Sequence, residues 1–437
     1  MTNFAVSRES GKPRLAIIST FDELCGIAGY TKALVPQLKN HFDITVFDLD
    51  QFLFRAEAKS VQRLADAEIT RICKELRNFD AVNIQLEHGT LGRTKKAIFR
   101  RFTRLVDASP RVCVTFHTIL QSKQFPWGDV ASAVLKLRFD KVVGIYGNHV
   151  DNEMLSTKLY AHLRKRQASV IVHTRRDMRM LKYVHGIESI FDHPLAFYPK
   201  AVVDEVKRTT RREDFLRLGQ LPEGTVVLGC FGFVSKYKGI DVALRALRLL
   251  PSNFHLAIFG GLHPNEIKQG VSIDAYVSNL LGQIEPGRKW LDVRQDEDAK
   301  VNLTLSAGDY EKLTLAKHPS DLSSRVHFVG ALKDDDFPKA MEVCDVALLP
   351  YMEVGQSSSG PMSIAIEMGK PIVASRTKAF MQIERYHPDR LNLFEIGNFL
   401  ELAQVVCAVA AREDVVHTQG KYDAESNTLV YKQAMGY

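Results

Sequence analysis

The sequence lacks any uninterrupted apolar run of about 18 residues, the length that a helix needs to cross a bilayer. Its start also lacks the basic and then apolar pattern of a secretory signal. We therefore expect a chain that neither spans a membrane nor is exported by that route. The expected location is the cytoplasm, either free or at the inner face of the membrane.

Cysteine is scarce and unpaired. The 6 cysteines include no C-x-x-C pair, and several lie in apolar, strand-like runs. This pattern is typical of buried free thiols in a reducing compartment, and it predicts no zinc site. No low-complexity tract interrupts a composition that is 45% hydrophobic and 25% charged, which is typical of a globular protein. The 437 residues are enough for about two domains of roughly 200 residues each.

Charge is unevenly distributed. Residues 1–210 carry 33 Lys+Arg and 22 Asp+Glu, or +11, which leaves 25 and 29, or −4, for the rest of the chain. A basic amphipathic helix is predicted where apolar residues are interleaved at helical spacing with Arg93, Lys95, Lys96, Arg100, Arg101 and Arg104. Such a helix either lies on an anionic membrane or presents a solvated face. No recognition motif accompanies it, so we do not expect a nucleic-acid partner.

Short apolar, β-branched runs alternate with longer amphipathic stretches from residue 14 to about residue 410. This alternation predicts an α/β fold of parallel strands with helices on both faces. The pattern breaks at residues 192–215 and a second series opens at Val226. We therefore expect two doubly wound, Rossmann-like domains, 1–200 and 201–413, facing across a cleft lined by strand carboxyl ends. The tail 414–437 is expected to pack back on the first domain.

Three glycine-rich or serine-rich motifs follow predicted strands. In the first, Cys25-Gly-Ile-Ala-Gly-Tyr30, glycines at the start of a helix let backbone amides approach a phosphate. The alternative is purely structural: Gly26 permits a tight turn and Gly29 allows close helix packing.

The second motif, Phe231-Gly-Phe-Val-Ser-Lys-Tyr-Lys-Gly239, lies between a strand and an amphipathic helix. Ser235, Lys236 and Lys238 are candidates for binding a diphosphate, where helix dipole and ammonium charge add. The glycine spacing fits neither a Walker loop nor a dinucleotide fingerprint. Lysines before a helix are also often simply solvated.

The third motif is Gln356-Ser-Ser-Ser-Gly-Pro-Met-Ser363, followed by a helix that reaches Glu367. A small-residue loop that opens a helix exposes amides to a ligand, and a carboxylate such as Glu367 can accept hydrogen bonds from the vicinal hydroxyls of a ribose. The alternative is that Ser359 caps the helix and Glu367 lies on the surface.

Taken together and in this order, the motifs make the chain resemble the retaining nucleotide-sugar glycosyltransferases of the GT-B fold, the family 4-like or group 1 enzymes. The resemblance covers nearly the whole chain and is weakest at 120–165 and 280–320. It implies a donor domain at 201–413 and an acceptor-side domain at 1–200.

The resemblance also implies roles for single residues. The donor would be bound by Gly26, Ser235, Lys236, Lys238, Gly330, Leu332, Ser358, Ser359, Gly360, Pro361, Met362 and Glu367. His117, at the end of a predicted strand, would face the transferred sugar and act with Lys238 and Glu367 in catalysis. His88 and Tyr30 would lie on the acceptor side.

Two residues depart from the family pattern. The family usually has a glutamate where this chain has Ser359, and an arginine where it has Phe233. Lys236 could supply the missing charge, and serine with backbone amides could contact the sugar.

The expected reaction is the transfer of a hexose from a UDP- or GDP-linked donor to a glycan or glycolipid, with retention, in bacterial polysaccharide or glycolipid synthesis. No cofactor and no metal are expected, because lysines and helix amides can stabilise the diphosphate. The Asp-x-Asp triplets are interpreted as solvated loop carboxylates at Asp48-Leu-Asp50, Asp296-Glu-Asp298 and Asp334-Asp-Asp336. A nucleotide-sugar epimerase and a non-catalytic sugar-binding or nucleotide-binding relative are the alternatives.

Overall fold

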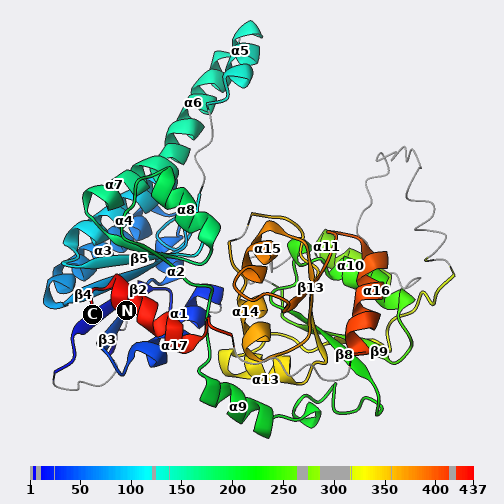
Figure 1. Ribbon diagram of the computed structural model, residues 1–437. Helices are drawn as coiled ribbons and strands as arrows, with labels where there is room; N and C mark the ends of the chain where they lie inside the picture. Colours follow the sequence, from blue (N-terminus) through cyan, green and yellow to red (C-terminus); the bar gives the residue numbers. More distant parts are fainter. Residues whose placement is uncertain are drawn as a thin grey trace. The chain divides into compact units, whose positions relative to one another are not determined.

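The chain forms two compact α/β units in a computed structural model, one of Met1–Phe197 with Lys421–Tyr437 and the other of Tyr198–Gly420 (Figure 1). The structure describes residues 3–5, 11–23, 25–120, 125–136, 138–262, 274–285, 315, 317–355, 357–412 and 420–437. The acidic triplet at 296–298 and most of the segment 280–320 lie outside these ranges. In the part of the chain that is described, no helix is both long and apolar enough to cross a membrane.

The first unit is built on a seven-stranded sheet in the order β1-β3-β2-β4-β5-β6-β7. All neighbours pair in parallel except β1, which runs antiparallel to β3. The strands are β1 (Asn3–Ala5), β2 (Arg14–Ser19), β3 (Asp43–Asp48), β4 (Ala81–Leu86), β5 (Val112–Phe116), β6 (Ser169–Val172) and β7 (Ile190–Asp192). Every residue of β4 and β5 is buried, because helices cover both faces of a parallel sheet.

The helices of the first unit follow the expected alternation. They are α1 (Gly26–Leu38), α2 (Gln51–Phe54), α3 (Lys59–Glu75), α4 (Lys95–Ala108), α5 (Trp127–Leu135), α6 (Phe139–Glu153), α7 (Leu159–Lys165), α8 (Arg175–Tyr183) and α17 (Ala424–Ala434), with a π-turn η2 (Met154–Lys158) between α6 and α7. Helix α17, from the end of the chain, packs against α1, β6 and β7.

The second unit has a fully parallel six-stranded sheet in the order β10-β9-β8-β11-β12-β13. Its strands are β8 (Val226–Phe231), β9 (Phe254–Phe259), β10 (Val326–Phe328), β11 (Val346–Leu349), β12 (Ile372–Ser375) and β13 (Leu391–Phe394). Its helices are α9 (Lys200–Thr209), α10 (Ile240–Leu249), α11 (Ala275–Ile284), α13 (Phe337–Glu342), α14 (Gly360–Glu367), α15 (Lys378–Glu384) and α16 (Phe399–Ala410). The predicted α/β fold is confirmed: the second sheet is fully parallel, and the first is parallel except for β1.

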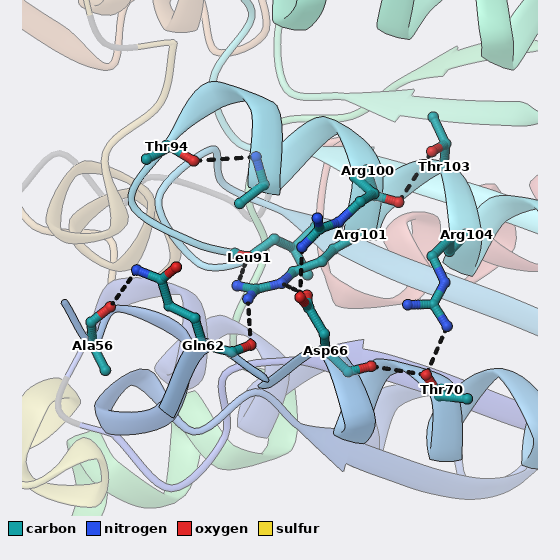
Figure 2. A network of polar contacts seen from close by, with 11 residues as sticks. Ala56, Gln62, Asp66, Thr70, Leu91, Thr94, Arg100, Arg101, Thr103 and Arg104 are labelled. Atoms are coloured by element: carbon teal, nitrogen blue, oxygen red, sulfur yellow. Dashed lines mark hydrogen bonds and ion pairs between the residues drawn. The ribbon is translucent and has the colours of Figure 1, made fainter. Parts of the chain in front are cut away.

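The basic segment 93–104 lies largely in α4, where Lys96 is exposed but several other cations are engaged within the unit (Figure 2). The buried Arg101 donates from Nε to Asp66 Oδ1 at 2.7 Å and from Nη1 to Leu91 O at 2.8 Å. Arg100 donates to Asp66 Oδ2 at 2.5 Å, and Arg104 to Thr70 Oγ1 at 2.7 Å.

Two more cations of this segment are also paired, Arg93 with Glu57 and Lys95 with Asn152. Because these charges are used inside the unit, the predicted membrane-binding surface on this segment gains no support from the structure. The ordinary amphipathic helix is the better description.

We expect Asp66→Asn to lower the free energy of unfolding by about 2 kcal/mol, less than for a fully buried ion pair, because Arg101 is buried but Asp66 is 30% exposed. Burial acts to raise the pKa of Asp66, but the hydrogen bonds and charges of Arg101 and Arg100 lower it on balance. The contribution of this carboxylate is therefore present above the ordinary carboxyl pKa and is lost as pH falls through the lowered one. Urea unfolding at neutral and acidic pH measures both effects.

Glu75→Gln is the matched control, because Glu75 belongs to the same helix α3 and pairs with the half-exposed Arg71. It should change stability by about 0.5 kcal/mol or less. Equal losses in the two variants would contradict the importance of the buried pair.

Candidate functional site

Three histidines follow neighbouring strands at the carboxyl edge of the first sheet. His117 comes directly after β5, His173 after β6 and His193 after β7. The rings of His117 and His173 are 5.1 Å apart, and Tyr30 of α1 packs edge-on to them at 5.4 and 5.7 Å. All four side chains are buried. The structure thus places Tyr30, predicted on the acceptor side, inside the unit.

A chain of hydrogen bonds fixes which ring nitrogen of His117 carries the proton. Its Nε2 meets Gln85 Oε1 at 2.8 Å, and Gln85 Nε2 donates to Asn83 Oδ1 at 2.6 Å. Since an amide oxygen only accepts, His117 Nε2 carries the proton and Nδ1 keeps its lone pair in the neutral ring. Burial, and then the neighbouring His173, hold the pKa of His117 well below the ordinary value. A neutral imidazole here can accept a hydrogen bond from a ligand hydroxyl.

The hydroxyl of Tyr431, on α17, completes this network. It accepts from Gln85 Nε2 at 3.2 Å and lies 3.0 Å from Thr115 Oγ1 and 3.3 Å from Tyr30 OH. Burial raises the pKa of Tyr431 well above the ordinary value, so the phenol stays protonated. The tail therefore orients Gln85 and, through it, His117. Sequence reasoning did not select Tyr431, because the tail showed only a few apolar and aromatic residues in a polar segment.

We expect Tyr431→Phe to lower the free energy of unfolding by about 2 kcal/mol, because it leaves buried polar partners without their hydrogen bonds. Urea unfolding followed by circular dichroism measures the loss. Tyr437→Phe is the control, since this half-exposed ring contacts Phe42 at 5.3 Å and phenylalanine keeps that contact. A Tyr431→Phe protein as stable as the control would show that the hydroxyl is dispensable.

His88 follows β4 and lies beside the strand end that carries His117. Its Nε2 is 3.2 Å from Thr118 O, and burial lowers the pKa of His88 to about 4. Glu87, which sequence reasoning did not select, accepts from Thr118 Oγ1 at 2.8 Å, and burial raises its pKa. Thr118 thus joins the two strand ends.

Gly26 is the first residue of α1, and a Cβ built on it meets no atom within 4 Å. Its φ is not positive either, so neither a tight turn nor packing requires glycine here. The Sγ of Cys25 caps the helix by accepting from Ala28 N at 3.4 Å. Open space at a helix start is compatible with the predicted approach of a phosphate.

The sequence had suggested that Asp48 and Asp50 are solvated loop carboxylates, but both are engaged in the fold. Asp48 ends β3 and is partly buried, with Oδ1 accepting from Phe21 N at 2.7 Å. Asp50 caps α2 through Leu53 N. Among the residues that the structure describes, no group of three or more His, Cys, Asp or Glu side chains could hold a metal ion.

In the second unit, Lys238 lies in the short turn η4 (Lys236–Lys238) after β8, and its side chain is buried. Its Nζ donates to Tyr351 OH at 2.5 Å and lies 4.0 Å from the centre of that ring. Burial lowers the pKa of Lys238 to about 7. Its ammonium is therefore held inside the unit and is partly deprotonated near neutral pH.

The residues around Lys238 are set by close packing. Gly239 has φ +65°, and a Cβ on it would lie 1.8 Å from Pro350 O, so only glycine fits. Lys236 is exposed, whereas Ser235 and Phe233 are half-buried, with Ser235 Oγ donating to Phe233 O at 3.4 Å. The exposed Lys236 is thus the cation of this motif that reaches solvent.

Ser359 caps α14, as the alternative interpretation of this motif expected. Its Oγ accepts from Met362 N at 3.5 Å. A hydrogen bond with the Ser359 side chain opposes the burial that raises the pKa of Tyr351. Tyr351, which sequence reasoning missed, therefore connects Lys238 with the start of α14. Of the remaining predicted donor residues on this helix, the Met362 side chain is fully buried, while three are half-buried, namely Ser358, Gly360 and Pro361.

Glu367 ends α14 and is not a freely exposed surface residue. Its Oε2 accepts from Tyr198 N at 3.2 Å, and Tyr198 OH lies 3.4 Å from Asp334 O. Tyr198 therefore links Glu367 to Asp334, the first residue of the short turn η6 (Asp334–Asp336) that follows the loop of Gly330 and Leu332. Glu367 was predicted to hold the ribose, and Gly330 and Leu332 the base; these roles stay predictions.

The comparisons with known proteins agree with this architecture. Residues 288–412 match the family model of glycosyl transferases group 1. This stretch contains the loop after β10, α14 and Glu367. Among curated proteins, none matches the sequence.

Solved structures match nearly the whole chain at low identity. HepE from Anabaena, in complex with UDP and glucose, is 14% identical with a TM-score of 0.56 over 97% of this chain and 99% of that one. Sucrose-phosphate synthase from Thermosynechococcus elongatus is 13% identical with a TM-score of 0.56 over 97% and 96%. WaaG, a glycosyltransferase involved in lipopolysaccharide biosynthesis, is 12% identical with a TM-score of 0.52 over 96% and 98%. The chain has the two-domain GT-B fold that these proteins share.

Proposed function

We propose that this protein is a glycosyltransferase that moves a hexose from a nucleotide sugar to a glycan or a lipid-linked acceptor. The observation that carries the proposal is that Tyr198 contacts both Glu367, at the end of α14, and Asp334, just after the loop that follows β10. Glu367 and Asp334 both lie in the stretch that matches a glycosyltransferase family. A carboxylate beside a loop with open backbone can hold a nucleoside by its ribose and base.

The chemistry of the second unit suits a diphosphate leaving group. The start of α14 offers the positive end of the helix dipole and the amide of Gly360, because Pro361 has no N–H and the amide of Met362 donates to Ser359 Oγ. Lys236 and Lys238 lie in the motif after β8. We propose that these groups stabilise the departing diphosphate without a metal. With retention, the departing phosphate would take the acceptor's proton on the face that the acceptor attacks. His117, neutral and with a lone pair on Nδ1, would accept a hydrogen bond from a hydroxyl of a bound sugar.

The departures from the family pattern shape the proposal. At Ser359 and Phe233 this chain lacks a carboxylate and a guanidinium that the family usually has. Hydroxyls, amides and lysines would contact the sugar and the phosphates in their place. HepE structures contain UDP or UDP-glucose, which supports UDP as the first nucleotide to test. Synthesis of a bacterial polysaccharide or glycolipid is the proposed setting.

Calorimetric titration with UDP, GDP, ADP and their sugar conjugates tests the donor site. We expect one nucleotide to bind and Glu367→Gln to weaken it by about tenfold or more, because a charged hydrogen-bond acceptor is lost. Glu395→Gln is the control, since Glu395 is exposed and pairs with Arg376 in the same unit. It should leave the affinity within about twofold.

The result that would contradict the donor site is binding that Glu367→Gln leaves unchanged. Absence of binding for every nucleotide would favour a non-catalytic relative with a different ligand.

The pKa of Lys238 predicts how nucleotide affinity depends on pH. If the diphosphate binds the protonated lysine, affinity should fall as pH rises from 7 to 9, by up to about tenfold per pH unit, because the free lysine loses its proton above about 7. In Lys238→Met this fall should disappear and affinity should be low throughout. A pH dependence that survives in Lys238→Met would assign it to another group.

A further inference from the structure

Helices α5 and α6 form a hairpin that projects from the first unit (Figure 1). Its base is fixed to the unit, because Asn152 of α6 contacts Lys95 of α4 and because η2, which follows α6, contains the buried Leu155. Along the hairpin, Phe125 packs edge-on to Trp127 at 4.7 Å and to His149 at 4.9 Å. The hairpin lies in 120–165, one of the two segments where the sequence resemblance to glycosyltransferases is weakest.

The hairpin exposes large apolar side chains. Leu135 is 84% exposed, Trp127 74%, Val143 72% and Tyr146 61%. Single exposed apolar residues are common on protein surfaces, but several on one small projecting element mark an interaction site. Leu135 and Val143 lie near the turn between the helices, at the end of the hairpin far from its base.

The same end is cationic. Lys136, Arg138 and Lys141 are exposed, and residues 134–143 contain three Lys or Arg and one Asp. Apolar side chains with cations beside them are the combination that enters the headgroup region of an anionic bilayer. The two helices, of 9 and 15 residues, are too short to span the hydrocarbon core.

Charge also decides between a lipid surface and a second copy of the chain. Two hairpins that met end to end would bring Lys136, Arg138 and Lys141 of both copies together, and like charges repel. An anionic bilayer instead attracts every one of these groups. In α4, Arg100 and Arg101 are paired with Asp66.

We propose that the α5–α6 hairpin docks the protein on an anionic lipid bilayer, with Leu135 and Val143 in the interface and the neighbouring cations at the phosphate groups. This docking is independent of the transfer reaction and goes beyond the proposed function. It would place the protein beside acceptors that are lipids, but it does not require them.

Vesicle flotation tests the proposal with the full chain. We expect the wild type to float with vesicles of phosphatidylcholine and phosphatidylglycerol at low salt, and to float much less with phosphatidylcholine alone. Leu135→Glu/Val143→Glu should reduce partitioning at least tenfold, and Lys136→Gln/Lys141→Gln by about fivefold for each lysine. The thermal midpoints should stay unchanged, because these side chains are exposed.

Leu216→Glu is the matched control, since Leu216 is 80% exposed but belongs to the second unit; it should float like the wild type. The proposal is overturned if the wild type binds neither vesicle, or if the hairpin variants float as well as the control. It is also overturned if sedimentation shows an oligomer that Leu135→Glu/Val143→Glu dissociates, since the hairpin would then serve a second copy.

Discussion

Polar side chains buried at the carboxyl ends of parallel strands need hydrogen-bond partners inside the protein. In each unit a tyrosine hydroxyl supplies such a partner. Tyr431 joins Gln85, Thr115 and Tyr30 in the first unit. Tyr351 joins Lys238 and the Ser359 cap in the second. Because an unpaired neutral polar group in a sheet interior costs roughly 1–3 kcal/mol, each hydroxyl holds the candidate site of its own unit in one arrangement.

This packing also sets the charges. His117 is neutral because burial lowers its pKa, and burial lowers the pKa of Lys238 to about 7, so its charged and neutral forms are both present near neutral pH. A bound diphosphate would restore full protonation of Lys238, so part of the binding energy would be spent on charging a buried group. The exposed Lys236 carries no such cost, which is why the two lysines of one motif are not equivalent.

The fold could be predicted from the sequence because continuous apolar strands need helices on both faces, and the runs recur in two series. The charge of α4 was harder to interpret. Helical spacing showed which face is basic, but not that Asp66 and Glu57, from other segments, neutralise it. Burial of Lys238 was equally hidden, because it depends on Tyr351, more than a hundred residues away.

Candidate site residues could be predicted from the sequence as positions after strands, and the structure connects Glu367 through Tyr198 with Asp334. The side chains between them were not predictable. Tyr198, Tyr431 and Glu87 stand in ordinary sequence contexts, and their importance arises from contacts between distant segments. The roles of the predicted residues in catalysis stay predictions.

The most direct test of the central claim is proton NMR of nucleotide sugars incubated with the protein, with water as the default acceptor. The account predicts release of free nucleotide and a hexose that first appears as the anomer present in the donor. A new nucleotide-sugar anomeric signal without nucleotide release would instead identify an epimerase, and a bound donor that stays unchanged would identify a binding protein; either result would contradict the account.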